Sequence, residues 1–302
     1  MNAQNVIPMP TPDITVSLAN TALLVKLTVT MWSANAKDKR AGKEVMASHN
    51  VKDKRGARVY KSLLPNSTLH AEIESLVGEA RRTSSALTLP WSDGGERILN
   101  VTALQEYVGT MTDFKRRFDN AVNALLLELQ NEITKAAFTM GSLFDLKDYP
   151  TEQEVRAKYS FKWDVSPLPT TADFRVDMPR EMAELVKQSY ISAGQSRVEQ
   201  AMNDAWSRLH DKLQHLLDRL TSDEDGERKV FRGGLLESAH ELVDTLQHLN
   251  VTGDVRLEQA RLALKNALRG LSTEQVKQST VARIEVAEDV KKVIDQFSML
   301  SL

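Results

Sequence analysis

The chain of 302 residues contains no cysteine, and only 6% of its residues are aromatic. The absence of cysteine excludes disulfides, thiolate metal sites and cysteine nucleophiles, and it is compatible with a reducing cytoplasm. The remaining composition, 26% charged and 41% hydrophobic, is that of an ordinary soluble globular protein. We therefore expect a soluble chain that is long enough to bury a sizeable core.

Long apolar runs are also missing. No stretch approaches the roughly 20 apolar residues that cross a bilayer. The N-terminal region, with Pro8, Pro10 and Pro12, lacks a basic stretch followed by an apolar one, as a secretory signal would require. We expect a cytoplasmic protein without a membrane partner.

Motifs for catalysis and cofactors are absent from the sequence as well. It has no glycine-rich loop ending in Lys-Ser or Lys-Thr, no dinucleotide fingerprint and no nucleophile elbow. His240 lacks the second histidine of a zinc motif. The acidic residues at 223–227 imitate the start of a calcium loop, but Arg228 replaces the required glycine and Gly234 replaces the required glutamate. We predict no enzymatic activity, no cofactor and no metal site.

Short strands are predicted in the first half of the chain. Apolar residues alternate with polar ones at 22–32, which is typical of a half-buried strand. Residues 87–99 predict a hairpin with a turn at 92–95, and residues 160–166 predict another strand, with a partner at 173–176. Because these strands do not alternate with helices as βαβ units, a doubly wound sheet is not expected.

Helical periodicity dominates the rest. Capping boxes at Thr151/Glu154 and Ser272/Gln275 mark two helix starts, and Gly109 and the 110–113 stretch are candidates for an interruption of the second helix. The expected helices are 68–83, 101–141, 151–159, 179–221, 233–249, 255–270 and 273–298, with a polar loop at 222–227.

These patterns predict a predominantly α-helical α+β fold. Long antiparallel helices, as a helical hairpin or coiled coil, would accompany a small antiparallel sheet. We expect an α+β domain at 1–178, with the first strand, a basic segment and the hairpin, and a helical bundle or coiled-coil region at 179–302.

The strongest charge asymmetry lies directly after Trp32. Between this residue and Lys61 there are nine cations and three acidic residues, a net charge of +6 in a chain whose total is −2. We interpret this segment as a short helix and loop broken near Gly42 and Gly56. Two interpretations stay open, a solvated face and a phosphate-binding surface. The candidate nucleic-acid-binding residues are Lys37, Lys39, Arg40, Lys43, Lys52, Lys54, Arg55, Arg58 and Tyr60.

Aromatic residues beside such cations matter, because single strands are held by basic grooves with aromatic platforms for stacking. Trp32 and Tyr60 are the candidates for stacking. For Trp32 we favour the alternative, in which it ends a core strand.

The order of several segments resembles a family of uncharacterised helical proteins of tailed bacteriophages. The resemblance covers residues from about 20 to 250 and is carried by residues 23–32, 60–65, 88–94, 114–122, 148–150 and 173–176. Relatives are often encoded among phage genome-metabolism genes, and distant ones beside MoxR-type AAA+ ATPases. The resemblance implies a setting in the host cell cytoplasm and carries no functional residue.

Our leading hypothesis is a non-enzymatic phage protein that binds nucleic acid, single-stranded DNA in the first instance, as a homo-oligomer during phage DNA metabolism. The alternatives are a helical adaptor or regulator of a protein partner, such as an AAA+ ATPase or a host factor, and a structural component of the virion. The adaptor would use the apolar seam of the 179–221 helix or the C-terminal helices.

Overall fold

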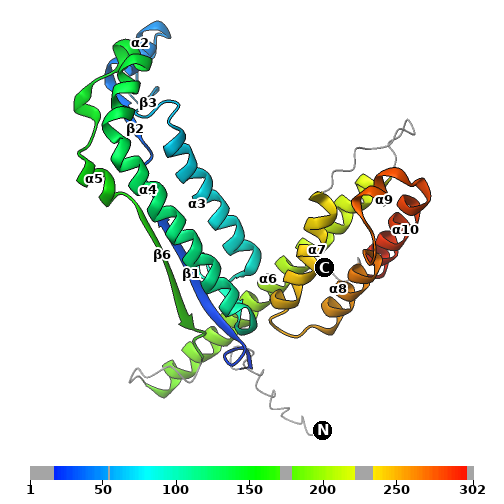
Figure 1. Cartoon of the computed structure of the whole chain (residues 1–302). Helices are drawn as coiled ribbons and strands as arrows, with labels where there is room; N and C mark the ends of the chain where they lie inside the picture. The colour runs from blue at the N-terminus through cyan, green and yellow to red at the C-terminus, as the bar shows by residue number, and fades with distance from the viewer. Residues whose placement is uncertain (1–16, 54, 171–178, 222–233, 298–302) are drawn as a thin grey trace, which may run out of the picture. The chain divides into compact units, whose positions relative to one another are not determined.

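The computed structural model describes residues 17–53, 55–170, 179–221 and 234–297 (Figure 1). The structure is 68% helical and contains a four-stranded antiparallel sheet and a two-stranded one. The expected α-rich α+β class, with long antiparallel helices and a small antiparallel sheet, is therefore confirmed.

The strands are β1 (Ala22–Thr30), β2 (Asn35–Asp38), β3 (Val59–Ser62), β4 (Leu89–Pro90), β5 (Arg97–Asn100) and β6 (Ser160–Pro167). The α-helices are α2 (Lys39–Ser48), α3 (Thr68–Leu87), α4 (Leu104–Met140), α5 (Glu152–Ala157), α6 (Arg180–Leu220), α7 (Gly234–Leu249), α8 (Val255–Ala267), α9 (Thr273–Gln278) and α10 (Thr280–Phe297). Short 3-10 helices are η1 (Val101–Ala103), η2 (Gly141–Leu143) and η3 (Leu146–Asp148).

The chain forms two compact units. One comprises Met1–Lys26, Ser85–Tyr107 and Asp164–Leu302 and is called the bundle unit; the other comprises Leu27–Ser84 and Val108–Trp163 and is called the hairpin unit. The chain passes from one to the other within β1, α3, α4 and β6. The linear division expected at 178 stays a prediction.

The larger sheet has the strand order β4-β5-β1-β6, and the bundle unit contains β4, β5 and the first part of β1. Strand β5 pairs antiparallel with β1, from Ala22 opposite Asn100 to Val25 opposite Arg97. The turn between β4 and β5 places Gly95 at φ +82°, a conformation that glycine adopts without steric cost. The predicted first strand and hairpin are thus confirmed.

Helices complete the bundle unit. Helix α6 packs against α7, α10 and β4, and α8 packs against α7 and α10. The apolar seam predicted for α6 is buried in the unit's own core, including Val198, Leu209, Leu213 and Leu216. Because this seam is already covered, it is not an open surface for a partner.

The hairpin unit is built on α3 and α4, which run side by side in opposite directions (Figure 1). Phe118 of α4 packs near Tyr159 and Phe161, at ring-centroid distances of 6.1 and 5.6 Å. The Thr151–Glu154 capping box starts α5, as predicted. Burial raises the pKa of the Tyr159 hydroxyl to about 12, so this ring belongs to the core.

Several local predictions were wrong. Helix α4 continues through Gly109, because one glycine costs only about 1 kcal/mol relative to alanine in a helix that packs along its length. Helix α2 likewise continues through Gly42, which is buried. The predicted helix at 273–298 is divided at Ser279, whose hydroxyl accepts a hydrogen bond from the Ala282 N–H at the start of α10.

The basic segment holds two strands as well as a helix, which we had not predicted. The partner strand expected at 173–176 and the polar loop at 222–227 lie outside the described residues.

Candidate nucleic-acid interface

The basic segment forms one end of the hairpin unit, and we call residues 35–62 the basic tip (Figure 1). Strands β2 and β3 pair antiparallel, with Asn35 opposite Ser62 and Asp38 opposite Val59. Helix α2 and the loop after it connect these two strands. The tip is therefore a two-stranded ribbon that carries a helix.

Helix α2 begins where Asp38 caps it. The Asp38 carboxylate accepts hydrogen bonds from the backbone N–H groups of Arg40 and Ala41, both at 2.9 Å. The bond from Ala41 is the main cause that lowers the pKa of Asp38; burial opposes it, while the Arg40 N–H and the Lys61 charge add to it.

The first turn of α2 has an unusual charge. It contains no acidic residue and begins with Lys39 and Arg40. A helix N-terminus carries partial positive charge, so cations there are unfavourable by roughly 0.3–1 kcal/mol. Lys39 and Arg40 therefore do not stabilise α2. A bound anion would offset the unfavourable interaction between their charges and the helix dipole.

Almost all the predicted site residues are accessible to solvent. Lys54 lies outside the described residues. The cations of the tip that are exposed are Lys37, Lys39, Arg40, Lys43, Lys52, Arg55 and Arg58.

Ion pairing leaves most of these cations available. Arg40 lies 3.8 Å from Glu44 and Arg55 lies 3.6 Å from Asp53, and all four side chains are largely exposed. Exposed pairs of this kind contribute about 0–1 kcal/mol and exchange readily for another anion. The other five exposed cations form no ion pair with any residue that the structure describes.

One face of the ribbon combines a cation with an aromatic ring. Lys37 of β2 is directly opposite Tyr60 of β3. Tyr60 is 59% exposed, whereas Trp32 is only 5% exposed and packs near His70, at a ring-centroid distance of 6.4 Å. The interpretation of Trp32 as a core residue is confirmed, and of the two stacking candidates only Tyr60 can meet a base.

Lys61 faces the other side of the ribbon and has a different role. Its side chain is only 8% exposed, and its Nζ lies 2.6 Å from a carboxylate oxygen of Asp148 and donates to the Leu143 carbonyl at 2.6 Å. A second carboxylate, that of Asp38, is 3.8 Å away. Lys61 therefore fastens β3 to the η2–η3 segment and is not available to a phosphate. The period of two along β3 was the sequence signal that separates Lys61 from Tyr60.

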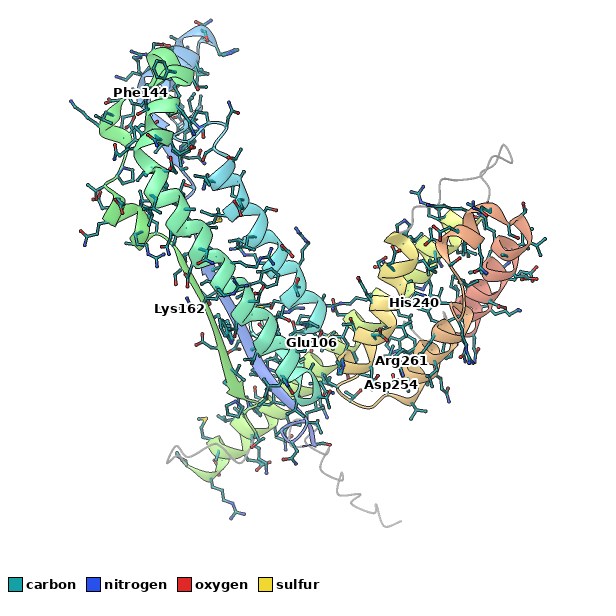
Figure 2. All side chains as sticks on the ribbon, viewed as in Figure 1. Glu106, Phe144, Lys162, His240, Asp254 and Arg261 are labelled. Atoms are coloured by element: carbon teal, nitrogen blue, oxygen red, sulfur yellow. The ribbon has the colours of Figure 1, made fainter. Side chains whose placement is uncertain are left out.

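A groove of about 370 Å³ lies between the tip and the η2–η3 segment. Lys37, Lys39 and Arg40 line one side, and Phe144, labelled in Figure 2, lines the other. Three carboxylates, those of Asp38, Asp145 and Asp148, also line it. Cations and carboxylates both line this groove, so the groove itself is not uniformly positive. The positive surface is formed by the exposed cations on the solvent side of the tip.

Other hollows lie elsewhere in the described chain, and one of about 480 Å³ between α3 and α4 has Glu72, Glu79 and Arg117 in its lining. A mainly apolar cavity of about 350 Å³ lies between α6 and α10 in the bundle unit, with Ile284, Glu288 and Lys291 in its lining. Within the described ranges, no three His, Asp or Glu side chains gather as metal ligands. The calcium-like sequence at 223–227 is not among the described residues. No described helix has the length and apolar character needed to cross a membrane.

Comparisons with known proteins add no relative. No protein-family model, no curated protein sequence and no solved structure matches the chain.

Proposed function

We propose that the chain binds single-stranded nucleic acid, DNA in the first instance, through the basic tip and without enzymatic activity. The observation that carries the proposal is the gathering of seven exposed cations around an exposed tyrosine on one small element. Phosphates would contact the cations, and a base would stack on Tyr60 beside Lys37. The resemblance to phage proteins supplies the setting of the proposal, which is DNA metabolism in an infected cell.

Salt dependence is the first test. Each neutralised phosphate of a single strand contributes about −0.7 to the slope of log K against log salt. If the five unpaired cations bind phosphates, the affinity for an oligothymidine should fall roughly 100-fold between about 50 and 200 mM salt. Fluorescence anisotropy with a labelled oligonucleotide measures this. An affinity that does not change with salt concentration, or no binding at micromolar protein, would overturn the proposal.

A matched pair of variants locates the surface. Lys39→Gln combined with Lys43→Gln should reduce the slope by about 1.4 and weaken binding to every sequence alike. Lys162, an exposed lysine of β6 labelled in Figure 2, is the control, because Lys162→Gln changes charge outside the tip. If Lys162→Gln and the tip variant lose the same affinity per removed charge, binding depends on the net charge of the chain and not on the tip.

Strand specificity is tested at Tyr60. Tyr60→Ala should weaken single-strand binding by about 1–3 kcal/mol, whereas Tyr60→Phe should retain it. A duplex of the same sequence should not distinguish the three proteins, because its bases are already stacked. If Tyr60→Ala changes nothing, the cations bind phosphate without a stacking platform.

A further inference from the structure

Helix α4 carries the two most exposed large apolar side chains of the described residues. Leu127 is 85% exposed and Phe138 is 86% exposed. Eleven residues separate them, which is three helical turns or about 16 Å, so both lie on one face of the helix. A partner that covers this face would remove both large apolar groups from water.

The surface between them carries no charge. Asn131 and Thr134 are exposed on the same face, with Gln130 and Ala137 beside them. Asn131 donates to Glu128 at 2.7 Å and the Thr134 hydroxyl donates to the Gln130 carbonyl at 2.8 Å, so these polar groups already have partners within the helix. Covering this face would therefore leave few hydrogen bonds unmade.

Charged side chains lie along one edge of this face. Glu128 and Lys135 are both exposed and seven residues apart, so they lie on the same side of the line from Leu127 to Phe138. Lys135 also contacts Glu132 of its own helix at 2.7 Å. The edge thus presents one acidic group near Leu127 and one basic group near Phe138.

We infer that this face, residues 127–138 of α4, binds a second copy of the chain with the two helices antiparallel. A two-fold axis beside the middle of the stripe places Leu127 of each copy against Phe138 of the other. The same axis brings Glu128 of each copy near Lys135 of the other along the shared edge. In a parallel pair the two-fold axis runs along the helices and places the charged edges of the two copies on opposite sides, so Glu128 and Lys135 do not meet and the contacts between opposite charges are lost.

The inference depends only on the geometry of α4. It stands whether or not the basic tip binds nucleic acid, and mass measurements without nucleic acid test it separately. Each dimer would carry two basic tips, so one strand could engage both if its length allowed.

The absence of cysteine makes the orientation directly testable, because any introduced thiol is unique. Leu127→Cys protein mixed with Phe138→Cys protein should form a disulfide-linked pair under mild oxidation. Leu127→Cys protein alone should not, because its two sulfurs would be about 16 Å apart along the helices, while a disulfide needs Cα atoms within about 7 Å. Cross-linking of Leu127→Cys protein alone, without a mixed disulfide between the two variants when they are combined, would overturn the antiparallel arrangement.

Light scattering of the full chain over a concentration series measures assembly. The mass should approach twice 33.8 kDa, and Leu127→Ser with Phe138→Ser should raise the dimer dissociation constant at least tenfold. Leu146→Ser, at another exposed leucine of the hairpin unit, is the control and should leave assembly unchanged. Glu128→Lys and Lys135→Glu should each weaken the dimer, and the two together should restore it. A chain that stays monomeric, or a dimer that the double serine variant does not weaken, would overturn the inference.

Discussion

The basic tip and the helical bundle use cations in opposite ways. In the bundle unit, Arg261 is buried and donates to both carboxylate oxygens of Glu258, at 2.6 and 2.8 Å (Figure 2). Arg283 is also buried and donates to the carbonyls of Leu220 and Arg219 at the end of α6. In the tip, most cations are exposed to solvent, and the charges of Lys39 and Arg40 in the first turn of α2 do not favour that helix.

This difference shows what a charge count along a sequence leaves out. A cation that satisfies a buried carbonyl or carboxylate stabilises the fold, and its removal leaves an unpaired group. A cation without a partner contributes little to stability and stays free to bind an anion. Within the tip, Lys61 is the buried exception and is paired like the bundle arginines, whereas Arg40 donates to the Ser142 carbonyl at 2.8 Å but stays largely exposed.

The largest expected effect follows from that exception. Lys61→Met should lower the free energy of unfolding by about 2–3 kcal/mol, because it leaves the Asp148 and Asp38 carboxylates without their cation. Lys37→Met, in the opposite strand but exposed, should change it by less than about 0.5 kcal/mol. Urea denaturation followed by circular dichroism measures both. Equal small changes would mean that Lys61 is not a structural cation.

The bundle provides the second prediction. Arg283→Met should lower the free energy of unfolding by about 2 kcal/mol, because the Leu220 and Arg219 carbonyls lose a charged donor. Lys291→Met, at an exposed position of the same helix, is the control and should be nearly neutral. If both variants unfold at the same urea concentration, the contact of Arg283 with the end of α6 is unimportant for stability.

The sequence predicted long periodic elements well, because the hydrophobic pattern is a sum over many residues. This pattern predicted the helices α3, α4 and α6. Both capping boxes follow from a Ser or Thr three residues before a Glu or Gln. The sequence did not predict β2 and β3, since the run Asn-Ala-Lys-Asp has low strand propensity and pairs only because β3 lies beside it.

Helix α2 continues through Gly42 and α4 continues through Gly109, for different reasons. A glycine weakens a helix by about 1 kcal/mol, and packing along the 37 residues of α4 exceeds that cost. At Gly42 an added Cβ would lie 3.9 Å from the backbone N of Val59, so the helix approaches β3 closely there. At Gly109 an added Cβ would meet no neighbouring element within 4 Å, so packing elsewhere along α4 carries the helix through this position.

The third prediction concerns Lys39 in the tip, and its expected effect on stability is smaller. Lys39→Glu places an acidic residue in the first turn of α2, where the helix dipole favours it, and should raise the stability of the chain by about 0.5 kcal/mol. The same substitution should weaken oligonucleotide binding. A variant that is more stable and binds less would show that Lys39 serves binding at the cost of stability. Loss of both would mean instead that the side chain supports the fold.

The smallest effect concerns pH and compares the two capping boxes. In the hairpin unit, Glu154 accepts hydrogen bonds from the backbone N–H and the hydroxyl of Thr151, and these bonds lower its pKa below the ordinary 4.5. Its contribution to stability is therefore complete above about pH 4.5 and is lost as the pH falls through the lower folded value. In the bundle unit, Gln275 fills the same position and does not titrate.

Glu154→Gln gives the capping box of α5 a glutamine at the position that Gln275 fills in the capping box of α9. The variant should lose less stability than the parent chain between neutral pH and pH 3, when both are followed by urea denaturation. Gln275→Glu is the reciprocal change and should add acid sensitivity to the bundle unit, because the new carboxylate would accept the same hydrogen bond from the Ser272 N–H. If neither exchange alters the pH dependence, both boxes act through geometry alone and charge contributes nothing to them.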